Sequence, residues 1–217
     1  MKEFQNKNIF FVIPARKNSK GFPFKNRKLL DFTINQIPLE FQQKTIITTD
    51  DEQIINRISS LKMKILKRDK KLCLDDTNIR DVMLDVSQKF EMKPQDIIIM
   101  LYLTYPNRKF SDIEKIFRHY KIKNATSLLC CSKPKSHPFL CLFKKGGGKG
   151  EQIVEHDHYR RQDYPECLEI KHFVCIFQVN EILKLNKNMY NKNTIYYEIN
   201  DDIDIDYESD FEQFQKK

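Results

Sequence analysis

Two polar segments, one near each end of the chain, carry residue types that could bind a phosphate group and a metal ion. The first, at 15–27, reads ARKNSKGFPFKNR and surrounds Gly21 with cations that include Arg16 and Lys20. Backbone amides near a glycine, together with two or three cations, can hold a polyphosphate. The segment matches neither the GxxxxGK[ST] phosphate loop nor the GxGxxG dinucleotide turn, so a solvated basic loop is an equally good interpretation from local chemistry alone.

The second segment is DIDID at 202–206. Alternate residues of an extended chain share one face, so Asp202, Asp204 and Asp206 can aim their carboxylates together while the isoleucines between them enter the core. Clustered carboxylates repel one another unless a cation joins them, and Mg²⁺ is bound by one or two carboxylates beside substrate phosphates. The segment could equally be an acidic turn before a weak helix at 208–215.

The residues between these segments alternate between strand and helix patterns. Buried and β-branched runs predict strands at 9–13, 44–50, 63–66 and 96–103, and helical spacing predicts helices at 28–37, 52–61, 79–90 and 110–121, the last capped by Ser111. This order predicts an α/β fold with a Rossmann-like, mainly parallel sheet flanked by helices. Such sheets bind ligands beyond the carboxyl ends of their strands, where the basic segment lies.

The pattern changes after residue 125. Strands are expected at 126–132, 167–179 and 193–199, whereas 139–155 reads as two strands joined at Gly146 to Gly148. We therefore expect a single domain over 1–217 that carries an inserted antiparallel arm at 128–166. No repeat or long linker divides the chain.

Composition limits the classes of partner. The chain has 217 residues, 38 Lys and Arg, 30 Asp and Glu, a net charge of +8 and a pI near 9.0, all of which favour anionic partners. Its cations are scattered rather than gathered into a stripe with aromatics, which argues against nucleic acid. The six cysteines form no CxxC, and no secretory or membrane-spanning apolar run occurs. We expect reduced thiols and a cytoplasmic protein that does not enter a membrane.

Six segments resemble motifs of the acylneuraminate cytidylyltransferases, also called CMP-sialic acid synthetases. The basic segment is similar to that family's nucleotide-binding loop, [IL]xARxxSKGxxxKN, and the acidic one to its SIDIDTxxDF signature. Between them lie, in order and at compatible spacing, TIITTDDEQI, LDDT, TYPNRKFSDI and YRRQDYPE, which are similar to the family's STDxxxI, ASDT, TSPLRTxxDI and PRQxLP segments. The resemblance covers nearly the whole chain. It implies the nucleotide-diphospho-sugar transferase type of fold.

The resemblance implies a CTP-dependent nucleotidyltransferase that moves CMP onto an acidic 2-keto-3-deoxy (nonulosonic or ulosonic) sugar and releases pyrophosphate. The residues that it implies for CTP are Arg16, Ser19, Lys20, Lys25, Asn26 and Arg68. Asp204 and Asp206 would bind Mg²⁺ and, with Arg16 and Lys20, would be catalytic. The acceptor sugar would contact Arg161, Tyr102 and Thr104. The family works as homodimers in which the arm crosses to the partner's site, and Arg161 would act from its own or the neighbouring subunit.

The segments that would face the acceptor depart from the family pattern. Tyr102 stands where the family has a sugar-binding Gln, an HPLK-like stretch at 137–140 lacks its lysine, and the NGAIYI segment reads KHFVCI at 171–176. A different acidic acceptor is therefore an alternative, as is a pseudoenzyme that binds a nucleotide or acidic sugar without transfer. His156 and His158 could share a strand face and bind a metal, although a place at the end of the hairpin is the better interpretation.

Overall fold

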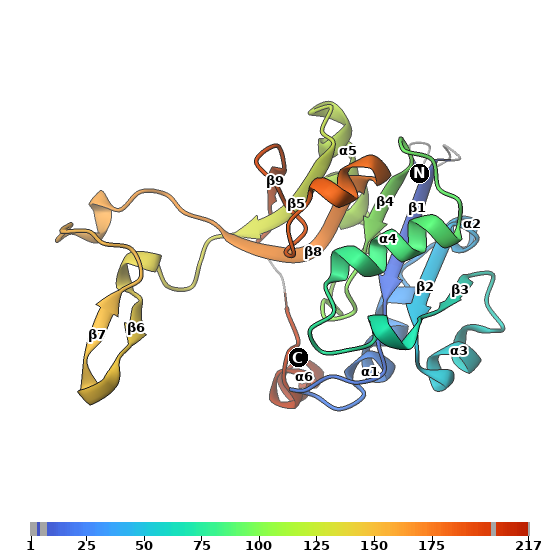
Figure 1. Cartoon of the computed structure of the whole chain (residues 1–217), viewed down its shortest axis with the longest axis horizontal. Helices are drawn as coiled ribbons and strands as arrows, with labels where there is room; N and C mark the ends of the chain where they lie inside the picture. Colours follow the sequence, from blue (N-terminus) through green and yellow to red (C-terminus); the bar gives the residue numbers. More distant parts are fainter. Residues whose placement is uncertain (1–3, 5–7, 201–202, 217) are drawn as a thin grey trace.

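The computed structural model describes residues 4, 8–200 and 203–216, and within them a seven-stranded sheet forms the centre of the molecule (Figure 1). Its order is β3-β2-β1-β4-β8-β5-β9. The strands are β1 Ile9–Pro14, β2 Thr45–Thr49, β3 Lys64–Lys67, β4 Ile97–Met100, β5 Ser127–Ser132, β8 Glu169–Gln178 and β9 Ile195–Glu198. Neighbouring strands are parallel except that β8 runs antiparallel to β4 and β5. The mainly parallel α/β sheet is thus confirmed.

Helices cover both faces of this sheet. The α-helices are α1 Lys25–Ile34, α2 Leu39–Gln42, α3 Glu52–Ile58, α4 Ile79–Lys89, α5 Phe110–Ile122 and α6 Glu208–Gln215. Shorter 3₁₀ turns are η2 Lys70–Leu72, η3 Pro138–Leu140, η4 Gly146–Gly148, η5 Arg161–Asp163 and η6 Val179–Lys184. Each predicted strand and helix therefore has a counterpart.

The two hydrophobic cores follow from the alternation of side chains along the buried strands. In β1, Phe11 and Ile13 enter the core beneath α1, α3 and α5, while Val12 enters the core beneath α4 and η6. All three side chains are fully buried. The apolar run that begins β1 is therefore covered on both faces, which fixes the position of the loop after Pro14.

Two helix starts differ from the sequence prediction. Helix α1 begins at Lys25, three residues before the predicted start, because the preceding Phe24 adopts a left-handed conformation with φ 54°. Ser111 does not cap α5, which begins at Phe110. Instead, the backbone N–H of Lys109 donates to the carboxylate of Asp112 at 2.9 Å, which satisfies that end of the helix.

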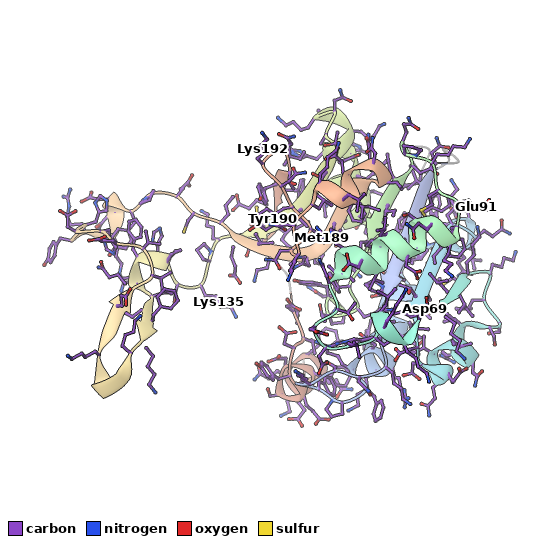
Figure 2. All side chains as sticks on the ribbon, in the orientation of Figure 1. Asp69, Glu91, Lys135, Met189, Tyr190 and Lys192 are labelled. Atoms are coloured by element: carbon purple, nitrogen blue, oxygen red, sulfur yellow. The ribbon has the colours of Figure 1, made fainter. Side chains whose placement is uncertain are left out.

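A hairpin projects from the body between β5 and β8 (Figure 1). Strands β6 Leu142–Lys144 and β7 Gly150–Gln152 pair antiparallel and are joined through Gly146–Gly148, as predicted. No residue from 133 to 169 is buried. The predicted arm at 128–166 overlaps β5, which is buried in the main sheet, so the name arm is used below for 133–168. Figure 2 shows its side chains apart from the body, with Lys135 near its base.

None of the six cysteines forms a disulfide, in agreement with the expected reduced thiols. In the part of the chain that the structure describes, no helix is both long and apolar enough to span a bilayer.

Candidate active site

A cavity of about 410 Å³ opens beyond the carboxyl ends of β1 and β4. This is the edge at which parallel α/β sheets place their ligands. Segments from both ends of the chain form its wall. The predicted site residues that line it are Arg16, Ser19, Lys25, Asn26, Arg68, Tyr102, Thr104, Asp204 and Asp206. One cavity thus brings together the residues predicted for the nucleotide, the metal and part of the acceptor site.

The basic loop packs directly against the acidic segment. The buried Lys25 donates from Nζ to the carbonyl of Ile205 at 3.0 Å and to Oδ1 of Asp206 at 3.1 Å. A Cβ added to Gly21 would lie 3.0 Å from the carbonyl oxygen of Asp206 and 3.3 Å from the Tyr207 ring. Any other residue here would force the two segments to shift by a few tenths of an ångström, so glycine favours this close approach.

Arg16 and Lys20 both face one carboxylate. Nη1 of Arg16 lies 3.0 Å from Oδ1 of Asp75, and Nζ of Lys20 lies 3.2 Å from Oδ2 of Asp75. The Lys20 side chain is 79% exposed, so its amine lies at the rim of the cavity rather than in its wall. Exposed ion pairs are weak, so an incoming phosphate can replace Asp75 as the partner of these cations. Asp75 was not predicted as a site residue, although it lies in the LDDT segment.

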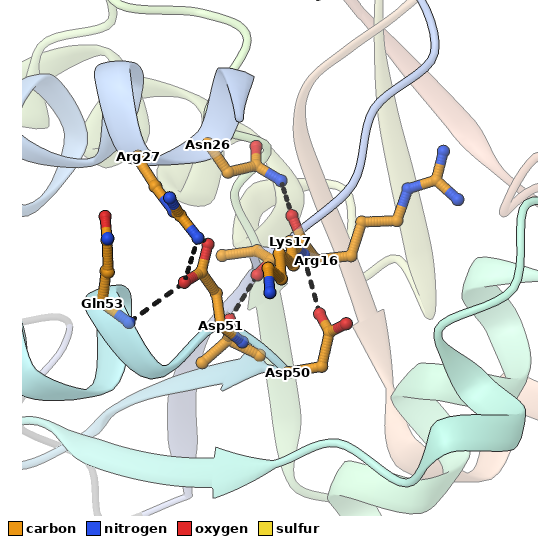
Figure 3. A network of polar contacts seen from close by, with 9 residues as sticks. Arg16, Lys17, Asn26, Arg27, Asp50, Asp51 and Gln53 are labelled. Atoms are coloured by element: carbon orange, nitrogen blue, oxygen red, sulfur yellow. Dashed lines mark hydrogen bonds and ion pairs between the residues drawn. The ribbon is translucent and has the colours of Figure 1, made fainter. Parts of the chain in front are cut away.

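Side-chain hydrogen bonds hold the basic loop in shape (Figure 3). Nδ2 of Asn26 donates to the carbonyl of Arg16 at 2.8 Å. Arg27 donates twice to the carboxylate of Asp51, at 2.6 and 3.0 Å, and this carboxylate also accepts from the backbone N–H of Gln53. In Figure 3 the Arg16 guanidinium points away from this network. The network fixes the loop backbone and leaves that guanidinium available to the cavity.

The two aspartates form a suitable pair of ligands for a hard cation. Ile205 between them is fully buried, as predicted, whereas Asp202 lies outside the described residues. Oδ2 of Asp204 accepts a hydrogen bond from the Tyr105 hydroxyl at 2.7 Å. Although the Asp204 side chain keeps contact with solvent, the surrounding protein raises its pKa, and the charge of Asp206 adds to this effect.

A divalent cation would relieve this unfavourable carboxylate environment, so the residues present fit Mg²⁺. No group of three or more His, Cys, Asp or Glu side chains in the described part could hold a metal ion. A pair of carboxylates is enough for Mg²⁺, because this ion keeps several waters and shares substrate phosphates.

Arg68 contributes a buried cation to the cavity. Arg68 is only 6% exposed, and its Nη2 donates to the carbonyl of Thr48 at 2.9 Å. Burial lowers the pKa of its guanidinium. Within the described residues it forms no ion pair with a carboxylate. A buried cation that lines a cavity with no carboxylate in direct contact favours an anionic ligand.

The far wall of the cavity is aromatic. The rings of Tyr102 and His172 meet edge to face with centroids 5.6 Å apart. His172 donates from Nε2 to the carbonyl of Asn188 at 3.1 Å, since that carbonyl can only accept. Burial raises the pKa of the Tyr102 hydroxyl. The sequence predicted that the segment 171–176 faces the acceptor, and His172 of this segment lines the cavity.

Two sequence predictions concern residues of the arm. Arg161 lies exposed in η5 and does not line the cavity of its own chain. The rings of His156 and His158 stack on Phe139 at centroid distances of 4.1 and 5.7 Å, and Nε2 of His156 bonds the Phe139 carbonyl. These histidines therefore pack within the hairpin, and they belong to no metal-binding group in the described part of the chain.

A model of the cytidylyltransferase family matches residues 10–215, from β1 to α6. This chain belongs to that family. The match includes both the basic loop and the aspartate pair, so the residues that meet in the cavity lie within the family domain.

Similar proteins include the N-acylneuraminate cytidylyltransferases of Streptococcus agalactiae serotypes V and III. Each is 24% identical to this chain over 212 residues, covering 92% of this chain and 51% of the relative. The chain thus spans about half the length of these curated relatives.

The solved structures that share the fold include two enzymes that illustrate the likeness. One is a CMP:2-keto-3-deoxy-manno-octonic acid synthetase complexed with CTP, with a TM-score of 0.68 and 14% identity over 97% of this chain and 98% of the other. The second is the 4-diphosphocytidyl-2C-methyl-D-erythritol synthase of Anaerococcus prevotii, with a TM-score of 0.65 and 13% identity over the whole of both chains. These likenesses confirm the expected type of fold.

Proposed function

We propose that this cytidylyltransferase transfers CMP from CTP to a hydroxyl of an acidic 2-keto-3-deoxy sugar and releases pyrophosphate. One observation carries the proposal: the cationic loop after β1 and the aspartates before α6 line one cavity in a member of this family. The names of the Streptococcus agalactiae relatives support an acidic nine-carbon acceptor, and the solved synthetase supports an eight-carbon one.

The chain's own residues would act by positioning and by neutralising charge. The acceptor hydroxyl attacks the α-phosphorus of CTP, the bond to the pyrophosphate oxygen breaks, and the hydroxyl proton leaves to solvent. Arg16 and Lys20 exchange Asp75 for the phosphates of the leaving group. Lys25 and Arg68 add positive charge from the cavity wall, while Ser19 and Asn26 border the nucleotide.

Asp204 and Asp206 are the residues that would hold Mg²⁺. When bound, this ion supplies charge neutralisation at phosphate oxygens. Lys25 keeps Asp206 in place by its contact with Oδ1, and the Tyr105 hydroxyl keeps Asp204 in place by its contact with Oδ2.

The acceptor site would be completed by a second copy of the chain. Tyr102 and Thr104 line the acceptor side of the cavity, but Arg161 lies on the projecting arm. The arm exposes several large apolar side chains, which a partner could cover: Leu140, Leu142, Phe143, Ile153, Val154, Tyr159 and Leu168. We therefore propose a homodimer in which Arg161 of one subunit holds the acceptor carboxylate in the site of the other.

The test is an assay of pyrophosphate release from CTP and Mg²⁺ with a panel of eight- and nine-carbon keto acids, followed by mass spectrometry of the products. We expect one member of the panel to yield its CMP conjugate together with an equal amount of pyrophosphate. Binding of CTP with no conjugate from any member would contradict the transfer and support the second candidate below.

The second candidate is a protein that binds the nucleotide or an acidic sugar without transferring CMP. The acceptor wall favours it, because Tyr102 and His172 stand where the family pattern has other residue types. Isothermal titrations with CTP and with each keto acid of the panel distinguish it from an unrelated function, because this candidate requires a saturable site for at least one of these ligands.

A further inference from the structure

Arg108 is a buried cation behind the acceptor wall. It lies beyond β4 and is only 3% exposed. Its Nη1 donates to the carbonyl of Phe173 at 2.6 Å, and its Nη2 donates to the carbonyl of Tyr102 at 2.9 Å and to Oγ1 of Thr33 at 3.2 Å. These three acceptors are neutral, and within the described residues the guanidinium has no carboxylate partner.

Such a group is costly to bury. A guanidinium out of water needs compensation, and a well-packed apolar side chain of similar volume is often as stable or more stable in its place. Burial lowers the pKa of Arg108 to about 10, which reflects the same cost. What the arginine adds is a planar fork of donors that can bind several fixed acceptors at once. An apolar side chain in its place could not hold these three acceptors together.

The acceptors join two elements that form the far wall of the cavity. Tyr102 belongs to the segment after β4, and Phe173 belongs to β8 directly after His172. The rings of Tyr102 and His172 contact each other across this junction. Tyr105, whose hydroxyl holds Asp204, packs its ring on Phe173 at 5.4 Å. Strands β4 and β8 pair directly as far as Met100 and Cys175. Beyond that end of the ladder, the Arg108 fork joins the Tyr102 and Phe173 carbonyls and so extends the connection to the acceptor wall.

The nucleotide side is less dependent on Arg108. Thr33, the acceptor on α1, lies eight residues after Lys25, which is about 12 Å along the helix. The basic loop has its own network through Asn26 and Arg27. Loss of Arg108 should thus disturb the acceptor wall far more than the CTP site.

We propose that Arg108 is a positioning residue that sets the acceptor site of this enzyme by tying Tyr102 to β8. It touches no substrate and acts through the placement of the Tyr102 and His172 side chains. The kinetic effect expected from losing Arg108 rests on the proposed transfer reaction. The expected displacement of the Tyr102 and His172 side chains does not depend on that reaction.

The kinetic test compares Arg108→Met, Arg108→Lys and the neighbouring exposed control Lys109→Met. We expect Arg108→Met to lower kcat/KM for the acceptor about 100-fold, the loss that small misplacements produce, with the Kd for CTP changed less than about twofold. Arg108→Lys should recover part of this loss, and Lys109→Met should match the parent. Equal weakening of CTP and acceptor, or unchanged kinetics in folded Arg108→Met, would overturn the proposal.

The second test does not need turnover. In ¹³C-histidine NMR spectra, the His172 signal is identified by its loss in His172→Gln. We expect Arg108→Met to shift this signal and to leave that of His119, on α5, in place. If Arg108→Met does not fold, Arg108→Lys and Arg108→Gln take its place in both tests. If the His172 signal does not move in Arg108→Met, the proposal for Arg108 is overturned. If the signal moves but the parent protein shows no transfer of CMP, only the proposed reaction is overturned.

Discussion

The basic loop after β1 and the arm each carry an arginine predicted to touch substrate, but they differ in what supports it. Arg16 belongs to a loop whose backbone is bonded by Asn26 and packed against Asp206. Arg161 belongs to a segment in which no residue is buried. The difference supports our proposal that one chain forms the nucleotide site alone and that the acceptor site takes Arg161 from the arm of a second chain.

The largest effect is expected from removing a carboxylate of the nucleotide site. Asp206→Asn should lower the rate of pyrophosphate release by about 1,000-fold, because one charged group that stabilises the transition state is lost. The Lys25 amine keeps its bond to the Ile205 carbonyl, so the melting temperature should stay near that of the parent. Glu212→Gln, on the exposed face of α6, is the matched control and should be fully active. A folded Asp206→Asn with parental activity would remove Asp206 from the metal site.

The second largest effect is expected from removing the arginine of the arm. Arg161→Ala should lower kcat/KM for the acceptor about 100-fold because the acceptor carboxylate loses a cation, while CTP binding is unchanged. Arg160→Ala is the control, since Arg160 pairs with Asp163 inside the arm.

Mixing these inactive variants tests whether the arm crosses between subunits. Arg161→Ala and Asp206→Asn chains, refolded or co-expressed together, should recover about a quarter of parental activity, because half of the dimers are mixed and each mixed dimer has one intact site. Activity no greater than that of the two variants alone would mean that Arg161 serves its own chain or neither site.

A smaller effect is expected where the two terminal segments touch. Gly21→Ala places a Cβ 3.0 Å from the Asp206 carbonyl oxygen, so the basic loop or the aspartate segment must shift by a few tenths of an ångström. We expect the Kd for CTP to rise about tenfold, within the cost that overpacking usually carries. Gly146→Ala is the control, because a Cβ there meets nothing within 4 Å. Equal CTP affinities for the two variants would show that the contact does not shape the nucleotide site.

The smallest effect concerns pH. The Tyr105 hydroxyl donates to the Asp204 carboxylate and so favours its ionised form, which opposes the rise in pKa caused by burial. Tyr105→Phe removes this bond, so the pKa of Asp204 should rise further. Because Mg²⁺ needs the ionised carboxylate, the acidic limb of the pH-rate profile should move to higher pH, with little change at alkaline pH. Tyr164→Phe, in the arm, is the control, and identical profiles for the two variants would contradict this role of Tyr105.

Most of the sheet could be predicted from the sequence because its strands are short, continuously apolar and buried on both faces, as β1 and β4 illustrate. The convergence of the basic loop and the aspartates followed from the rule that parallel sheets bind ligands at one edge, together with the family resemblance. The start of α1 could not be predicted, because Phe24 adopts a positive φ that residues other than glycine rarely take.

The residues that were missed act through tertiary contacts. Asp75 becomes part of the site only because the segment after η2 folds back over Arg16 and Lys20. Arg108 contacts the cavity wall through Phe173 of β8, which runs antiparallel between β4 and β5 after the chain has passed through the arm. No local pattern reports a pairing between segments so distant in the sequence.

The central claim is that the two terminal segments bind one triphosphate between them. A crystal structure with CTP and Mn²⁺ in place of Mg²⁺ tests it most directly. The account predicts anomalous density for the metal in contact with both Asp204 and Asp206, and a triphosphate whose oxygens have replaced Asp75 as the partner of Arg16 and Lys20. A triphosphate bound away from these four residues, or a metal that contacts neither aspartate, would contradict it.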